Sequence, residues 1–303
     1  MNEIIANNSI LIGKYHEIIN SHIEHHRKFF ENPASGRIEP FKIADNLYYV
    51  GDKYVCIHLI DTGDGLILLD SGYPGTAHLL IDNIWRAGFD PKDVRWIIHT
   101  HGHYDHFGVS EEFRTMFGTK LAISRVDADS IKEKPQRAHM LPESFPYAKI
   151  PTFDYEIEDG EIFELGNVKI RCVLTPGHTD GVLSLFFDVA YNGETYLAGL
   201  FGGVGIAALS LPYLCYHERP INSPYVMLKS VEKIENEPVV VHLGNHLGDN
   251  DFNLKYNQML KEGGNPFVAP NSWKKLLDYI KDLLNKTIDD NEKLLKELQA
   301  GNN

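Results

Sequence analysis

The chain has 303 residues, of which 43% are hydrophobic and 23% are charged, a composition typical of a folded globular protein. This excludes a disordered chain, a collagen-like repeat and a coiled-coil rod. The 29 Lys and Arg residues against 42 Asp and Glu residues give a formal net charge of −13, which disfavours nucleic acid and anionic lipid as partners.

The N-terminal segment does not match a secretory signal, because it begins with an acidic Glu3 and its apolar residues are interrupted by Asn7, Asn8 and Ser9. No segment reaches the roughly 18 apolar residues of a membrane span. The three cysteines form neither a zinc-finger pattern nor a disulfide framework, which suits a reducing compartment. We therefore expect a cytoplasmic protein that acts on a small molecule.

An amphipathic helix is predicted near the N-terminus, where Leu11, Tyr15, Ile18, Ile19 and Ile23 recur at helical spacing, and it should end before Pro33. Three roles are open for this helix. It could pack on its own body, form a homodimer arm, or cover a site as a lid.

Strands and helices then alternate, which predicts an α/β fold with helices covering the sheets. Predicted strands cover residues 54–60, 66–69, 94–98, 121–123, 162–165, 168–173, 182–187, 195–198 and 239–241, and predicted helices cover 77–87 and 107–117. A C-terminal amphipathic helix covers about 273–284, and the charged chain beyond Lys286 is expected to fray. Segments 132–152 and 202–225 fit no regular element and are predicted as loops over a pocket.

The most informative segment is HTHGHYDH, residues 99–106, directly after a predicted buried strand. His101 and His103 are two residues apart, so in extended backbone both rings leave the same face. Clustered imidazoles repel when protonated and are costly to bury, whereas a metal ion requires neutral imidazole and ionised carboxylate as ligands. Further ligands are expected from His178 and His246, which follow apolar strands in glycine-containing turns.

These motifs resemble those of the metallo-β-lactamase fold superfamily of binuclear metallohydrolases. The resemblance is carried by HTHGHYDHFG, TPGHTDG and a late histidine at the end of a strand. It is closest to the third subclass of class B β-lactamases and their non-resistance relatives, through EPFKIADNLYYVG, LILLDSG, AGFDPKDVRWIIHTHGHYDH, and Lys255 followed by Asn265–Phe267. It implies an αββα sandwich over residues 39–284. The periodic helix before it is then an N-terminal extension over 1–38, and the charged chain after it is a C-terminal tail over 285–303.

Carried over by position, the resemblance implies two metal sites. The first is held by His101, His103 and His178, and the second by Asp105, His106 and His246. His246 is preferred to His242 because of its spacing to Lys255. His242 and His99 are then interpreted as core or supporting residues. Asp70 resembles a buried aspartate that orients a ligand histidine, although a turn cap is the alternative.

One departure from the superfamily pattern concerns substrate recognition. Most hydrolytic members, including lactonases and glyoxalase-type thioesterases, have a bridging aspartate where this chain has Leu200. The third subclass lacks that aspartate too but usually has serines that bind a substrate carboxylate, and Leu200 and Phe201 cannot replace them. We predict substrate contacts from Leu200, Phe201, Tyr104 and Arg219, with packing as the alternative for Tyr104 and a plain surface position as the alternative for Arg219.

The function implied is hydrolysis of a cyclic amide or ester, β-lactam-like or lactone-like. Two zinc ions would share a water molecule and lower its pKa, giving a hydroxide nucleophile that Asp105 orients. The ligand types also suit iron or manganese, so a redox or hydrolytic enzyme with one of those metals is an alternative. A third possibility is a metal-binding module without catalysis.

Overall fold

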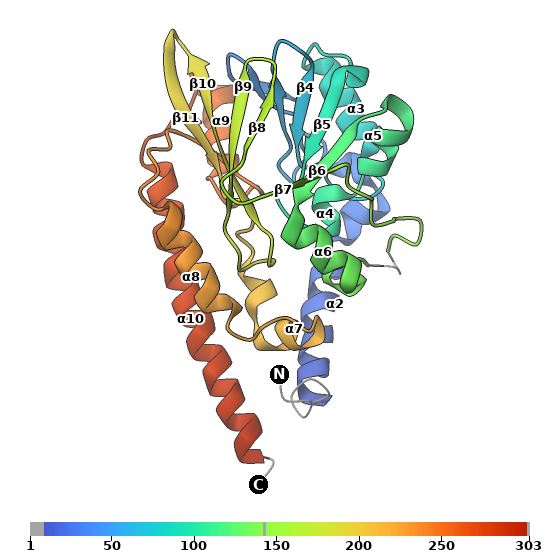
Figure 1. Ribbon diagram of the computed structural model, residues 1–303, viewed down its shortest axis with the longest axis vertical. Coiled ribbons are helices and arrows are strands. Elements are labelled where there is room, and N and C mark those ends of the chain that lie inside the picture. Colours follow the sequence, from blue (N-terminus) through green and yellow to red (C-terminus); the bar gives the residue numbers. More distant parts are fainter. Residues whose placement is uncertain (1–8, 142–143, 302–303) are drawn as a thin grey trace.

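The structure is a computed structural model that describes residues 9–141 and 144–301. Two β-sheets lie face to face and helices cover their outer faces (Figure 1). The predicted αββα sandwich with an added helix at each end is therefore confirmed.

The first sheet has seven strands that follow chain order from β1 to β7. The pairs from β1 to β4 are antiparallel, whereas β4, β5, β6 and β7 are parallel neighbours. Parallel strands end at the same edge of a sheet, so the segments after β4, β5 and β6 lie together. The strands are β1 (Phe41–Ala44), β2 (Leu47–Tyr49), β3 (His58–Asp61), β4 (Leu66–Leu69), β5 (Val94–Ile98), β6 (Lys120–Ser124) and β7 (Tyr155–Ile157).

The second sheet has five strands in the order β12-β11-β10-β9-β8. Only the pair β11 and β12 is parallel. The strands are β8 (Ile162–Leu165), β9 (Val168–Leu174), β10 (Leu183–Tyr191), β11 (Glu194–Leu200) and β12 (Val241–Leu243). The turn between β9 and β10 and the segment after β12 carry the two distant histidines, His178 and His246.

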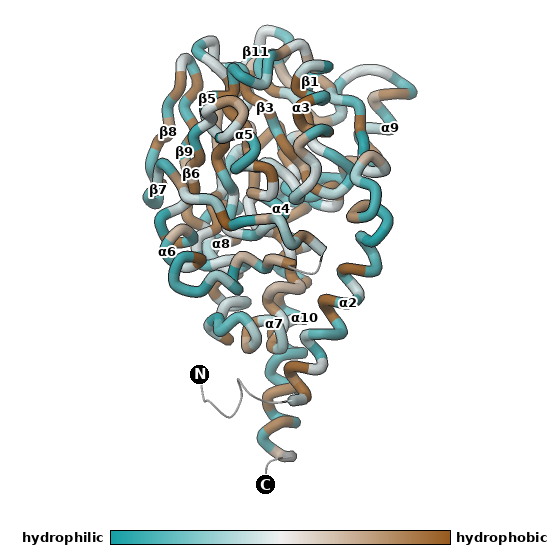
Figure 2. Tube along the Cα trace, turned by 90° about the vertical axis from the view of Figure 1, so that its right-hand side faces the viewer, coloured by the Kyte–Doolittle hydropathy of each residue, from teal (hydrophilic) through white to brown (hydrophobic). Residues whose placement is uncertain are grey.

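The helices divide between the two outer faces, and α2 and α10 extend beyond the body of the sandwich (Figures 1 and 2). Both alternate hydrophobic and hydrophilic residues along their length (Figure 2). No helix of the described residues is long and apolar enough to cross a bilayer. The α-helices are α2 (Ser9–Glu31), α3 (Ala77–Arg86), α4 (Tyr104–Phe107), α5 (Ser110–Phe117), α6 (Arg125–Glu133), α7 (Leu211–Tyr216), α8 (Ser223–Ile234), α9 (Phe252–Glu262) and α10 (Ser272–Gly301), and the short 3-10 helices are η1 (Pro33–Gly36), η2 (Pro91–Asp93), η3 (Pro135–Ala138) and η4 (Ile206–Leu209).

Three apolar clusters hold these layers together. The largest lies between the sheets and joins residues of both, such as Ile60 and Leu185. A second packs α3, α5 and the end of α2 on the seven-stranded sheet, and a third packs α8 and α10 on the five-stranded sheet. Burial of apolar surface on each face is the main favourable contribution to such layered folds.

Several element predictions need correction. The helix predicted over 107–117 is two helices, α4 and α5, because the N–H of Gly108 donates to the carbonyl of Gly72 instead of to the preceding turn. The segment 202–225 is not a loop throughout, since it contains η4, α7 and the start of α8. Helix α10 continues to Gly301 instead of fraying after Lys286. Its last part is held by Leu294, Leu295 and Leu298, which pack with Leu11 of α2 and Leu211 of α7.

Candidate metal centre

The predicted ligands come from segments that meet at one edge of the sandwich. Strand β5 ends at Ile98, residues 99–103 continue into α4, and this places His101, His103, Asp105 and His106 at the carboxyl edge of the parallel strands. The β9–β10 turn and the segment after β12 bring in two more histidines from the other sheet. Strand ends of this kind hold side chains rigidly while leaving them accessible.

The first group consists of His101, His103 and His178, whose candidate ligand atoms all lie within 4.8 Å of one another. Nδ1 of His103 is 3.2 Å from Nε2 of His101 and 3.0 Å from Nε2 of His178. His101 is fully buried and His103 is 6% exposed. Three ring nitrogens that face one another in a buried place are the arrangement that a metal ion requires.

The second group consists of Asp105, His106 and His246, again within 4.8 Å of one another. Oδ2 of Asp105 is 3.4 Å from Nε2 of His106 and 3.6 Å from Nε2 of His246. Nε2 of His106 is buried and has no hydrogen-bond partner. A buried polar atom without a partner is costly, and a cation at this position would satisfy it, so the residues fit a metal ion.

The two groups are adjacent, because the rings of His101 and His106 lie 4.1 Å apart between centroids. They share no residue, so no carboxylate of the described chain bridges them. Leu200, which stands where a bridging aspartate is expected, pairs with Leu185 and Leu243 inside the five-stranded sheet. The structure therefore places a leucine of the sheet where the superfamily pattern has the bridging aspartate.

Each distant histidine is oriented through its other ring nitrogen. Nδ1 of His178 donates to the carbonyl of Gly205, and Nδ1 of His246 donates to the carbonyl of Tyr54. Because a carbonyl can only accept, these bonds place the proton on Nδ1 and leave the Nε2 lone pair directed at the centre.

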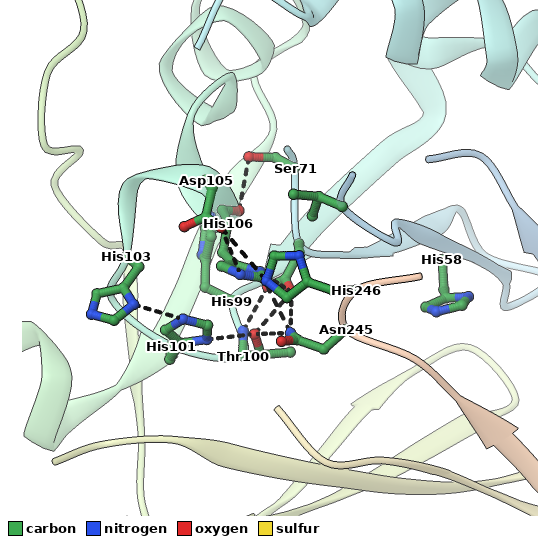
Figure 3. A network of polar contacts seen from close by, with 12 residues as sticks. His58, Ser71, His99, Thr100, His101, His103, Asp105, His106, Asn245 and His246 are labelled. Atoms are coloured by element: carbon green, nitrogen blue, oxygen red, sulfur yellow. Dashed lines mark hydrogen bonds and ion pairs between the residues drawn. The ribbon is translucent and has the colours of Figure 1, made fainter. Parts of the chain in front are cut away.

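Asp70 performs the same task for His106 and connects three segments. Its partners His106, Thr100 and Asn245 lie close together in Figure 3. Its carboxylate accepts from Nδ1 of His106, from the amide and hydroxyl of Thr100 and from the side chain of Asn245. Its backbone has φ +63°, a left-handed conformation that Asp and Asn tolerate better than most residues. Asn245 was not predicted as a site residue, and no spacing in the sequence singles it out.

The loop that carries His178 is held by two further buried side chains. The carboxylate of Asp127 accepts from the amides of Gly102 and Gly181 and from the hydroxyl of Thr179, so it joins the two ligand segments. The guanidinium of Arg219 donates to the carbonyls of Gly177 and His178 and to Asp180. The residues supporting the loop thus come from α6 and from the segment after α7.

The electrostatics of the first group favour neutral imidazoles. Burial, followed by the neighbouring histidines, holds the pKa of His101 and of His103 well below the usual value. Burial likewise lowers the pKa of His178 to about 3, against the opposing effect of its bond to Gly205. Neutral imidazole is the form that binds a metal ion, so the ligands need no deprotonation near neutral pH.

The electrostatics of the second group favour the charged forms of Asp105 and His106. Burial alone would lower the pKa of His106, but the charges of Asp105 and Asp70 outweigh it and raise this pKa to about 10. Burial would raise the pKa of Asp105, but His106 and then His246 hold it well below its usual range. An ionised carboxylate is therefore present, and a cation at this group takes the place of the His106 proton.

The four predicted substrate contacts are not all at the centre. Leu200 packs in the core between the sheets and Phe201 in the cluster under α8 and α10, so a substrate contact from either side chain stays a prediction. Arg219 is 3% exposed and is not a surface arginine, and its donors are used by the His178 loop. Tyr104 is buried against Tyr73, and its hydroxyl lies 3.4 Å from Nε2 of His22.

Other histidines lie close by that the sequence reasoning did not assign. His22 and His26 of α2 are within electrostatic range of Asp105 and His246, and His139 lies 5.9 Å from the ring of His103. The run SHIEHH at residues 21–26 was the available signal. The residues interpreted as supporting are buried as expected, since His99 bonds to Ala122 and Ser110, and His242 bonds to Ser272.

Comparison with curated proteins gives partial matches to hydrolases. An N-acyl homoserine lactonase of Bacillus sp is 25% identical over 169 residues, covering 48% of this chain and 63% of the relative. A hydroxyacylglutathione hydrolase of Maricaulis maris is 28% identical over 137 residues, covering 43% of this chain and 45% of the relative. The chain thus spans less than two thirds of the curated relatives that it matches.

Solved structures match over a longer range. The native FEZ-1 metallo-β-lactamase from Legionella gormanii superposes with a TM-score of 0.74 and 26% identity, covering 85% of this chain and 98% of that one. BJP-1, a subclass B3 metallo-β-lactamase of Bradyrhizobium japonicum, gives a TM-score of 0.74 at 24% identity over 86% of this chain and 97% of that one, which shows the shared fold. The family model described as Metallo-beta-lactamase superfamily matches residues 50–190, a segment that contains five of the six clustered ligand residues. The chain therefore carries a metallo-β-lactamase superfamily domain, as the histidine motif predicted.

Proposed function

We propose that the chain is a binuclear metal-dependent hydrolase that opens a carbonyl bond of a cyclic amide or ester. The observation that carries this proposal is the pair of adjacent groups, His101, His103 and His178 beside Asp105, His106 and His246. Structural metal sites are closed and usually hold one ion, whereas two adjacent three-residue groups leave coordination positions for water and substrate.

Zinc is the metal that we propose for both groups. Imidazole and carboxylate suit zinc, and the residues support it because each distant histidine presents a lone pair and Nε2 of His106 has no partner. When bound, the two ions would polarise the substrate carbonyl and activate water for attack.

The chain's own residues would hold and orient the reactants. Asp105 stays ionised, and its carboxylate lies near both His106 and His246, so it can accept a hydrogen bond from the attacking water. Asp70 fixes the His106 ring, and Arg219 with Asp127 fixes the loop of His178. These bonds would hold the ligands in place before substrate binds, and such preorganisation favours electrostatic catalysis.

The relatives support a β-lactam-like or lactone-like substrate. The similar solved structures are metallo-β-lactamases and the curated relatives include a lactonase. Leu200 separates this chain from the lactonases only, because it stands where they have a bridging aspartate. The buried Arg219 donates to the backbone carbonyls of Gly177 and His178.

The test is a hydrolysis panel with the full-length chain: a penicillin, a cephalosporin, homoserine lactones, a thioester and a phosphodiester, with metal content measured on the same sample. We expect turnover of a β-lactam or a lactone and its loss in His101→Ala. His78→Ala, a change at an exposed histidine of α3, is the matched control. No turnover of any cyclic amide or ester, or full activity in His101→Ala, would refute the proposal, and iron or manganese in an active sample would replace zinc.

A further inference from the structure

Helix α2 is fixed to the body at both ends. Near its start, the ring of Tyr15 stacks on that of Tyr216 at 3.6 Å, and Leu11 packs with Leu211 of α7. Near its end, Phe29 is buried against Tyr54, with ring centroids 4.3 Å apart. The middle turns of the helix therefore occupy a defined place in the fold.

A cavity of about 640 Å³ lies under these middle turns. Ile18, Ile19 and His22 of α2 form one wall, and His139, Ala207 and Tyr213 form the opposite one. This volume falls within the range of about 300–1,000 Å³ that small-molecule sites occupy. The cavity belongs to no part of the metal centre described above, because none of the six clustered ligands lines it.

The cavity is nevertheless adjacent to that centre. The ring of His139 lies 5.9 Å from the ring of His103 on one side and 6.2 Å from that of His22 on the other. Nε2 of His22 also lies 3.4 Å from the hydroxyl of Tyr104, which directly precedes Asp105. A substrate whose carbonyl lies at the metal centre therefore has this cavity next to it.

The lining of the cavity combines aliphatic and aromatic surface with imidazole rings. Ile18, Ile19, Ala207 and Tyr213 supply the first, and the rings come from His22, His25, His26 and His139. Among the described residues that line it, none is Lys or Arg, and Glu17 is the one carboxylate. The buried cation Arg219 does not line the cavity, and its guanidinium donates to the carbonyls of Gly177 and His178 and to Asp180. Isoleucine side chains and the faces of imidazole and phenol rings suit an uncharged hydrophobic or aromatic group.

We propose that this cavity is a specificity pocket, formed by α2, that receives an uncharged apolar or aromatic portion of the substrate beside the scissile carbonyl. The assignment to a substrate rests on the proposed function, whereas the binding preference of the cavity does not. Helix α2 then forms one wall of the substrate site. An αββα sandwich without this helix would lack that wall.

The experiment compares a neutral ligand with an anion of the same shape. Binding of 4-phenylbutanamide and of 4-phenylbutanoate to the full-length chain as purified is measured by calorimetry and ligand-observed NMR. Two variants fill the cavity from opposite walls, Ala207→Trp in η4 and Ser21→Trp in α2, and both positions are exposed, so the fold tolerates them. Ala190→Trp, at an exposed position of β10 away from the cavity, is the matched control.

We expect the amide to bind at least fivefold more tightly than the carboxylate, and both filling variants to weaken amide binding at least tenfold while Ala190→Trp does not. No detectable binding of the amide, equal or tighter binding of the carboxylate, or unchanged binding in both filling variants would overturn the inference. Binding is measured without turnover, so the binding preference of the cavity and the hydrolase activity are tested independently. A cavity that binds the amide in a chain without hydrolase activity would refute the proposed function and the assignment of the cavity to a substrate, and would leave only its binding preference standing.

Discussion

The carboxylate of Asp70 lies 2.7 Å from Nδ1 of His106, and both side chains are almost completely buried. The same carboxylate accepts from Thr100, the residue before His101, so it joins the two groups of the centre. Such supporting partners typically change metal affinity by about 10–100-fold when they are removed.

Asp70→Asn tests this link. The substitution keeps the shape and tolerates the left-handed backbone at this position, but it removes the negative charge beside His106. We expect the affinity of the second group for zinc to fall about 10–100-fold while the first group keeps its ion. Competition with a chromophoric chelator measures the two affinities, and Asp64→Asn in the exposed turn after β3 is the control. Unchanged affinity at both groups would show that Asp70 serves only as a turn cap.

Arg219→Gln tests whether the buried arginine positions His178. Its guanidinium spans the carbonyls of Gly177 and His178, and a glutamine cannot reach both together with Asp180. We expect about a tenfold loss of zinc affinity at the first group. Arg219→Lys should not restore it, since an ammonium lacks the planar fork. Arg125→Gln, at an exposed arginine of α6, is the control. A lower melting temperature with unchanged zinc affinity would reduce Arg219 to a purely structural role.

The stability of the fold should fall on acidification, in part through His58. Burial lowers the pKa of His58 to about 4, although its bond to the carbonyl of Gly244 opposes the shift. The unfolded chain, with a histidine pKa near about 6.5, then binds more protons than the folded one between about pH 4 and 6.5. The contribution of this residue is therefore complete above about pH 6.5 and is lost as the pH falls through that window.

His58→Gln should make the free energy of unfolding less dependent on pH, because the glutamine amide can still donate to the carbonyl of Gly244 but does not titrate. Between pH 7 and pH 5 we expect the wild type to lose about 2 kcal/mol more unfolding free energy than the variant. Urea unfolding at several pH values, with chelator present throughout so that metal binding does not contribute, measures the difference. Equal losses in the two proteins would show that His58 is not neutral in the folded state.

The fold and the six clustered residues could be predicted because short stretches of consecutive residues indicate them. A strand followed by three histidines and an aspartate within six residues is a dense motif, and glycine-containing turns after apolar strands marked His178 and His246. Most predicted strands are confirmed for the same reason, but β1, β2 and β7 were not predicted, and the strands predicted over 54–60 and 239–241 overlap β3 and β12 only in part.

The substrate predictions could not be made in this way, because they depend on how distant segments pack. Arg219 is charged, and charged residues usually lie at the surface, yet here carbonyls of a ligand loop satisfy a buried guanidinium. Leu200 ends β11 and Phe201 follows it, so successive side chains leave opposite faces and each is taken by a different core cluster. Helix α2 was predicted, and its packing on its own body is observed, but its approach to the centre depends on contacts with α7.

Besides the roles of the site residues and the identity of the metal, three predictions from the sequence stay predictions. These are the boundaries at residues 38 and 284, a homodimer formed through the N-terminal helix, and a location in the cytoplasm. The course of α10 across residue 284 into Gly301 gives the last segment a helical structure, which a charged tail need not have.

The central claim is that two groups from distant parts of the chain bind two ions, and metal stoichiometry tests it most directly. Elemental analysis of the full-length protein, purified without chelator and reloaded with zinc, should give two ions per chain. His178→Ala and His246→Ala should each retain about one, because each removes a ligand of one group only. Fewer than one ion per wild-type chain, or two ions retained in both variants, would contradict the account.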